Sequence, residues 1–199
     1  LADLIYLPEI PFSYEKLMAD IKKVMETKRQ VVIVVSEGIK FADGTFIAEA
    51  KTKDMFGHGQ LGGAAKNVEA KIKEALGVKT RSVEINVLQR CAAHYLSKTD
   101  IEESFIMGET GVKLAEEGKT GVMVGSVRKE GTEYALEIGC GAIENIANKE
   151  KKVPESYINA DKNGLTEAAY EYLEPLVMGE VHVKTEKGIP VHLSIRDFI

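Results

Sequence analysis

The chain has 199 residues, of which 44% are hydrophobic and 29% charged, so it can bury a core and is not globally disordered. Its 26 basic and 31 acidic residues give a net charge of −5, which argues against binding nucleic acid through the overall charge. No apolar run approaches the roughly 20 residues that cross a bilayer, so we expect no membrane partner. No signal peptide is evident, and Cys91 and Cys140 lack CxxC spacing, so we expect a cytoplasmic protein.

The first elements predict the fold class. Residues 4–7 are typical of a strand that ends at Pro8, and Ser13 is placed to begin a helix. The apolar positions of that helix recur at helical spacing: Leu17, Met18, Ile21, Val24 and Met25. Residues 31–35 form a β-branched run that suits a strand buried on both faces. Strand, helix and strand in this order predict a βαβ unit and an α/β protein.

A glycine motif follows this unit. Gly57, Gly59 and Gly62 match G-x-G-x-x-G, which binds dinucleotides when a buried strand precedes it and a helix follows. The residues before the first glycine, K-T-K-D-M-F at 51–56, do not form a buried strand pattern. We therefore interpret residues 51–63 as a flexible or ligand-facing loop and keep the dinucleotide site as the lesser alternative.

The later elements are predicted from caps and periodicity. We expect helices that start at Asn67 and Thr99 and stop at Gly77 and Gly118. The other expected elements are a strand over 81–88, a strand pair over 121–127 and 134–138, a helical stretch over 143–152, a turn at 163–164, a short helix over 168–177 and a weak strand in 181–199.

Arginine placement suggests an anion site. Arg81 begins the expected strand and Arg90 follows it, and the ends of strands are where α/β proteins collect ligand groups. A guanidinium grips a phosphate through two hydrogen bonds, although a solvated surface arginine is an equal alternative. Glu9, after the first strand, could accept hydrogen bonds from sugar hydroxyls, or it could be a charge near the helix start at Ser13. The four histidines are scattered and predict no metal site.

Five segments stand out together by their order and spacing: L-P-E-I-P-F at 7–12, V-I-V-V-S-E-G at 32–38, T-R at 80–81, L-Q-R at 88–90 and the expected helix over 100–118. In these segments the chain resembles the C-terminal half of 6-phosphofructokinase. Residues 88–94, 146–148 and 152–155 look more like the pyrophosphate-dependent branch than the compact ATP-dependent one.

The resemblance implies roles for single residues. Glu9 matches the glutamate that contacts the fructose hydroxyls, and Arg90 matches an arginine that grips the 6-phosphate. Arg81 matches an arginine that reaches the 6-phosphate in a neighbouring subunit, which implies a homo-oligomer. Val87 stands where relatives often carry a histidine or tyrosine that contacts the substrate; valine cannot make that hydrogen bond, and His94 is a candidate replacement.

The resemblance also implies the organisation of the chain. Residues 1–120 would form a three-layer, Rossmann-like, parallel-sheet substrate domain, and residues 121–199 a C-terminal annex. The family's Gly-rich phosphate loop, catalytic aspartate and Mg²⁺ site belong to an N-terminal half that is not found here, and the first residue is Leu1 rather than methionine. We therefore expect no catalytic, cofactor or metal residue in this chain, and we expect it to be inactive alone.

Three functions follow from these observations. The first is the sugar-binding part of a glycolytic enzyme that phosphorylates fructose 6-phosphate with pyrophosphate, reversibly and with Mg²⁺. The second is the same reaction with ATP as the donor. The third, from another class, is a non-catalytic sugar-phosphate-binding or assembly subunit.

Overall fold

The structure, a computed structural model, describes residues 2–53, 59–92, 95–131, 133–191 and 196. It divides the chain into two compact units. Unit 1 comprises residues 1–86 and 152–170, and unit 2 comprises residues 87–151 and 171–199.

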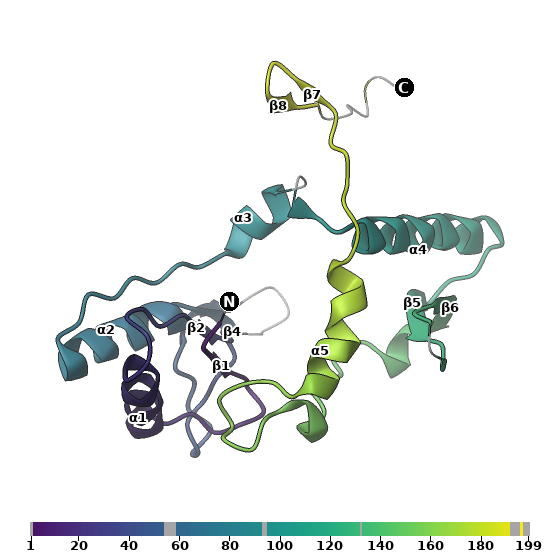
Figure 1. Cartoon of the computed structure of the whole chain (residues 1–199). Coiled ribbons are helices and arrows are strands. Elements are labelled where there is room, and N and C mark those ends of the chain that lie inside the picture. The colour runs from purple at the N-terminus through teal and green to yellow at the C-terminus, as the bar shows by residue number, and fades with distance from the viewer. Residues whose placement is uncertain (1, 54–58, 93–94, 132, 192–195, 197–199) are drawn as a thin grey trace. The chain divides into compact units, whose positions relative to one another are not determined.

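Unit 1 contains the βαβ unit that the sequence predicts. Its elements are β1 (Leu4–Tyr6), α1 (Tyr14–Met25), β2 (Ile33–Val35), β3 (Glu49–Lys53), β4 (Gly59–Gly62), α2 (Ala64–Leu76) and the short helix η3 (Glu155–Tyr157) (Figure 1). Strands β1 and β2 are parallel, with Leu4 opposite Ile33 and Tyr6 opposite Val35. Helix α1 makes the crossover between them, so the predicted α/β class is confirmed.

Helix α1 begins where the sequence predicts. The hydroxyl oxygen of Ser13 accepts a hydrogen bond from the Lys16 N–H at 3.2 Å, a cap that contributes about 1 kcal/mol to helices of this kind. Leu17 and Ile21 are the buried residues of α1. They join side chains from β1, the 39–47 loop and α2 in one core, in which Leu17 and Ile39 are 0% exposed. Burial of this apolar face, more than the cap, holds α1 on the strands.

An ion-pair cluster links α1 to β1. The carboxylate of Asp20, whose side chain is 12% exposed, accepts hydrogen bonds from the Tyr6 hydroxyl at 2.8 Å and from Lys16 Nζ at 2.7 Å. Burial raises the pKa of Asp20, but hydrogen bonds from Lys16, Tyr6 and Asn163 outweigh it and leave the pKa below its usual value. Burial and the hydrogen bond to Asp20 raise the pKa of Tyr6. The ionised carboxylate is therefore part of the native packing of unit 1.

The described part of the glycine-rich stretch is not the expected loop; residues 54–58 lie outside the described residues. Strands β3 and β4 pair antiparallel, with Glu49 opposite Gly62 and Lys53 opposite Gly59, which makes a hairpin where a loop over 51–63 was predicted. A hairpin needs backbone pairing rather than an apolar pattern, so a polar sequence does not exclude it. Gly59 and Gly62 lie in β4, and Gly57 lies outside the described residues. An antiparallel hairpin does not provide the parallel strand and turn of a dinucleotide site.

Helix α2 starts three residues before the predicted cap. Gly63, with φ of 89°, precedes the first helical residue, and Asn67 lies inside the helix. The Asn67 side-chain amide donates to the Ile47 carbonyl oxygen at 2.7 Å, which ties α2 to the loop before β3. The predicted stop is confirmed, since Gly77 ends the helix in the left-handed conformation with φ of 64°.

Unit 2 consists of a long helix, a hairpin and the C-terminal segment. Its elements are α3 (Asn86–Cys91), α4 (Lys98–Glu116), β5 (Val122–Arg128), β6 (Leu136–Ala142), η2 (Ile143–Asn145), α5 (Glu167–Leu173), η4 (Glu174–Val177), β7 (Thr185–Glu186) and β8 (Ile189–Pro190), with Asn86 and the first residues of α5 counted in unit 1. The predicted strand pair is confirmed, since β5 and β6 are antiparallel along their whole length. The predicted short helix over 168–177 is confirmed as α5 followed by η4, which contains Pro175.

Polar contacts within unit 2 join the C-terminal segment to these elements. Ser97 caps α4, two residues before the predicted Thr99: its hydroxyl oxygen accepts from the Asp100 N–H at 3.1 Å, and its hydroxyl donates to the Leu176 carbonyl. Arg128 of β5 lies over the ring of Tyr172, 4.8 Å from its centre, and donates to the Tyr172 carbonyl oxygen at 2.8 Å. Residues 171–179 are therefore bound to both α4 and the hairpin.

Two of the predicted elements are wrong. Residues 81–85 form no strand, and α3 covers residues 86–91, so the alternating apolar pattern of 81–88 does not pair. Its apolar side chains are exposed, with Val83 at 73% and Ile85 at 59%, and an apolar alternation forms a strand only beside a partner strand. Beyond η2 the predicted helix over 143–152 is also absent, since residues 146–152 have no helical assignment.

The two units do not coincide with the expected parts 1–120 and 121–199. Residues 152–170 belong to unit 1 because they are bonded to its strands and loops; the Ile5 N–H donates to the Asn163 carbonyl oxygen at 2.9 Å, for example. The division into a substrate-binding part and an annex remains a prediction about the whole protein. Among the described residues, no helix is both long and apolar enough to cross a membrane.

Candidate sugar-phosphate site

Glu9 lies just beyond the carboxyl end of β1, where the sequence predicts a ligand group. One carboxylate oxygen, Oε1, accepts a hydrogen bond from the Val153 N–H at 2.9 Å. The other, Oε2, is buried and has no hydrogen-bond partner among the described residues. A buried polar atom without a partner destabilises the fold by about 1–3 kcal/mol, so it needs a functional explanation. A hydroxyl group of a bound ligand would satisfy this oxygen.

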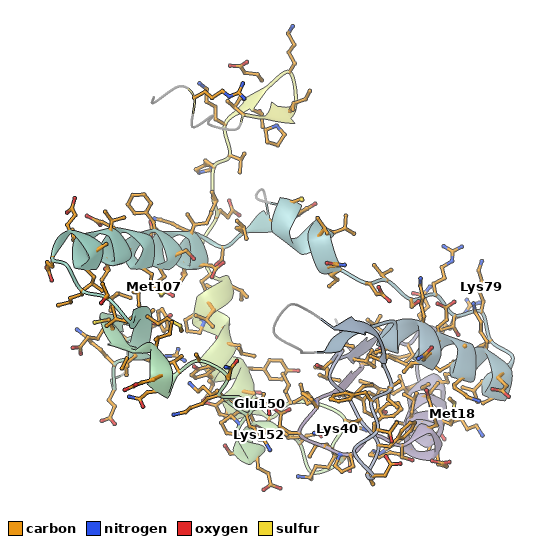
Figure 2. All side chains as sticks on the ribbon, turned by 180° about the vertical axis from the view of Figure 1, so that it is seen from behind. Met18, Lys40, Lys79, Met107, Glu150 and Lys152 are labelled. Atoms are coloured by element: carbon orange, nitrogen blue, oxygen red, sulfur yellow. The ribbon has the colours of Figure 1, made fainter. Side chains whose placement is uncertain are left out.

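The partner of Glu9 comes from a distant part of the chain. Val153 is 144 residues away in sequence, in the segment that returns to unit 1 at residue 152. Lys152, labelled in Figure 2, marks the start of this segment, and Pro154 follows Val153. A backbone N–H is a donor fixed by the chain, so it holds Glu9 in one orientation and leaves Oε2 for another donor.

A second carboxylate follows the other parallel strand. Glu37 comes two residues after β2, and its Oε1 accepts from the Ala64 N–H, the first N–H of α2, at 3.2 Å. It supplies the side-chain cap that Gly63 lacks. Because β1 and β2 are parallel, Glu9 and Glu37 both follow the carboxyl ends of strands, the edge at which α/β proteins bind ligands.

Arg81 lies on the segment between α2 and α3, which Lys79 marks in Figure 2. Its side chain is exposed and shows no hydrogen bond or ion pair to the residues that the structure describes. The neighbours of Arg81 are held on both sides. Val78 packs partly buried against the core of unit 1, and Ser82 donates from its N–H to Glu69 Oε2 at 2.9 Å.

Glu69, on α2, binds three donors. The Ser82 hydroxyl also donates to Oε2, and Lys73 Nζ donates to Oε1. Hydrogen bonds from Lys73 and from Ser82 lower the pKa of Glu69 to about 2, so this carboxylate is ionised at every pH at which the protein is expected to work.

The remaining predicted residues belong to α3 or follow it. Val87 is 59% exposed on α3, and the backbone of Arg90 lies in the same helix. The side chain of Arg90 and the whole of His94 lie outside the described residues. The structure thus brings Glu9 together with Val153 and places Arg81 on the same unit, whereas Val87 and Arg90 belong to unit 2.

Sequence reasoning missed Glu37 and Glu69. Glu37 follows a predicted strand as Glu9 does, so the same positional argument could have found it. Glu69 has no such signal, because its partner Ser82 is 13 residues away across a helix end and a turn. Among the described residues, no group of three or more histidine, cysteine, aspartate or glutamate side chains could hold a metal ion.

The chain is similar to known proteins of one family. The sequence model of a family described as Phosphofructokinase matches residues 1–108. The pyrophosphate–fructose 6-phosphate 1-phosphotransferase of Methylococcus capsulatus is 38% identical over 195 residues, which cover 98% of this chain and 46% of that protein. The protein of the same name from Halomonas elongata is 38% identical over 187 residues, 94% of this chain and 45% of its own length.

A solved structure shows the same fold. The crystal structure of a pyrophosphate-dependent phosphofructokinase from Nitrosospira multiformis matches with a TM-score of 0.79 and 33% identity, over 97% of this chain and 45% of that one. The chain therefore spans about half the length of the proteins it resembles.

Proposed function

Because the chain belongs to the phosphofructokinase family, we propose that the protein containing it transfers a phosphoryl group from pyrophosphate to the 1-hydroxyl of fructose 6-phosphate, reversibly. The chain itself contributes the binding site for the acceptor sugar. The names of the relatives support pyrophosphate rather than ATP as the donor. The protein would act in glycolysis in the cytoplasm.

The observation that carries this proposal is the state of Glu9. Its Oε1 is occupied by the Val153 N–H, and its buried Oε2 has no partner among the described residues. A carboxylate fixed on one side and unsatisfied on the other is suited to accept a hydrogen bond from a polyol. Glu9 would thereby orient the sugar so that its 1-hydroxyl faces the donor, which is the positioning that phosphoryl transfer requires.

The arginines are assigned to the 6-phosphate. Arg81 is exposed without an ion pair among the described residues, so its guanidinium is available for an anion. We assign it to the 6-phosphate in the site of a neighbouring subunit of a homo-oligomer, and Arg90 to the 6-phosphate in the site of its own subunit. The side chain of Val87 cannot donate a hydrogen bond to the substrate, so we assign the substrate contact expected at this position to His94.

Mg²⁺ belongs to the proposed reaction, but the residues described here do not fit a site for it. They contain no cluster of three or more candidate ligands, so we assign no step to a metal within this chain. The donor, the metal and the catalytic base would come from the remainder of a protein about twice as long. The isolated chain would then have no turnover of its own.

Sugar binding can be tested without turnover. Calorimetry on the protein that contains this chain should show tighter binding of fructose 6-phosphate than of fructose. Arg81→Ala and Arg90→Ala should each remove most of this difference in affinity between the two sugars. Arg29→Ala is the matched control, because Arg29 is also exposed in unit 1. Equal affinity for the two sugars, or loss of the difference in the Arg29 variant as well, would contradict the proposal.

A further inference from the structure

The contact between Glu69 and Ser82 lies directly beside Arg81. One carboxylate oxygen of Glu69 accepts hydrogen bonds from both the N–H and the hydroxyl of Ser82, so the carboxylate fixes the backbone as well as the side chain of Ser82. The Glu69 side chain is 19% exposed, which makes the contact more protected than a pair on an open helix face. The residue that follows Arg81 is therefore held to α2.

The residues before Arg81 are held as well. Val78 packs against the core of unit 1, and the Thr80 hydroxyl donates to the Val78 carbonyl oxygen at 3.3 Å. Thr80 and Ser82 are half-buried, whereas Arg81 between them is exposed. The backbone at Arg81 is thus fixed on both sides while its side chain extends into solvent.

The third contact of Glu69, with Lys73, neutralises the charge of its carboxylate. Lys73 Nζ binds Oε1, so the carboxylate is already paired within its own helix. A carboxylate without that lysine would be free to attract the Arg81 guanidinium. With Lys73 in place, the negative charge that fixes Ser82 does not compete with an incoming phosphate for Arg81.

We infer that Glu69 is a positioning residue for Arg81: it fixes the 80–82 backbone through Ser82 so that the guanidinium meets the sugar phosphate in a preset orientation. This inference rests on the proposed function, in which Arg81 binds the 6-phosphate. A fixed backbone reduces the ordering that binding must bring about, which increases the affinity for the phosphate without altering the reacting atoms. Glu69 should therefore act on substrate affinity and not on the chemical step.

The test uses steady-state kinetics of the protein that contains this chain, with pyrophosphate as donor. Glu69→Ala should raise the KM for fructose 6-phosphate about tenfold and leave kcat within about twofold. Glu74→Ala is the matched control and should change neither, because Glu74 lies on the same helix and pairs with Lys71 at 2.8 Å rather than with the 80–82 segment. Ser82→Ala removes the hydroxyl donor to Glu69 but keeps the N–H donor, so it should raise the KM by a smaller factor than Glu69→Ala does.

A double variant separates positioning from a general structural role. If Glu69 acts through Arg81, then Glu69→Ala should add no more than about twofold to the KM of Arg81→Ala. Additive effects, or an unchanged KM in both the Glu69 and the Ser82 variants, would overturn the inference. Should Arg81→Ala itself leave KM unchanged while the wild type turns over, the assignment of Arg81 to the phosphate would fail and the inference with it. No turnover of the wild type with pyrophosphate would instead contradict the proposed function.

Discussion

Glu9→Gln should separate affinity from stability. Glutamine keeps an oxygen that can accept from the Val153 N–H, the contact seen at 2.9 Å, but it removes the negative charge and the second acceptor. A hydrogen bond to a charged group contributes about 1.5–3 kcal/mol, which corresponds to a loss of affinity for fructose 6-phosphate of about 10- to 150-fold. The affinity should therefore fall by at least one order of magnitude.

The same substitution should not destabilise the fold. Oε2 is buried without a partner among the described residues, so its charge opposes folding until a ligand binds. Replacing it should leave the free energy of unfolding unchanged or raise it by up to about 1 kcal/mol. Calorimetric titration and urea denaturation measure the two quantities. Glu155→Gln is the control, because that side chain is 86% exposed near the same segment. A loss of stability of more than about 2 kcal/mol with unchanged affinity would mean that Glu9 is structural.

Three further changes test other parts of the account. Asp20→Asn should make the free energy of unfolding fall less steeply below about pH 4. The pKa of Asp20 is lowered in the folded chain, so its ionised form stabilises the fold above the unfolded pKa near 3.8, and this stabilisation is lost as the pH falls through the folded pKa. An equal acid dependence of the urea midpoint in the wild type and the variant would contradict this reasoning. Leu17→Ala, at a position that is 0% exposed, should lower the free energy of unfolding by about 2–5 kcal/mol, and a loss below about 1 kcal/mol would show that unit 1 is not packed as described. Mixing Glu9→Gln with Arg81→Ala subunits should restore about a quarter of the wild-type activity, because random pairing regenerates some intact shared sites; no recovery after subunit exchange would place both residues in one subunit's site.

What could be predicted from the sequence was mostly local. Ser13 and the apolar stripe from Leu17 define α1 through contacts within a few residues, and the strands on either side of it follow from their apolar runs. Gly77 ends α2 as predicted because a left-handed residue is needed there. These elements were predicted correctly because their causes lie within a few residues of each other.

The predictions that were wrong or incomplete concern residues whose structure depends on partners far away in the sequence. The 81–88 pattern predicts a strand, yet no partner strand pairs with it among the described residues, and the chain forms α3 instead. The position of Glu9 at the end of β1 is predictable, but its bond to Val153 depends on a segment that returns from 144 residues away. The role of Glu69 depends likewise on Ser82, beyond the end of α2.

The most direct test of the central claim follows the phosphoryl group itself. Phosphorus NMR of the protein that contains this chain, incubated with fructose 6-phosphate, Mg²⁺ and pyrophosphate, should show fructose 1,6-bisphosphate and orthophosphate appearing together, and ATP in place of pyrophosphate should give no product. The Glu9→Gln protein should need much more fructose 6-phosphate for the same rate. Product formed with ATP alone, or no product with either donor, would contradict the account.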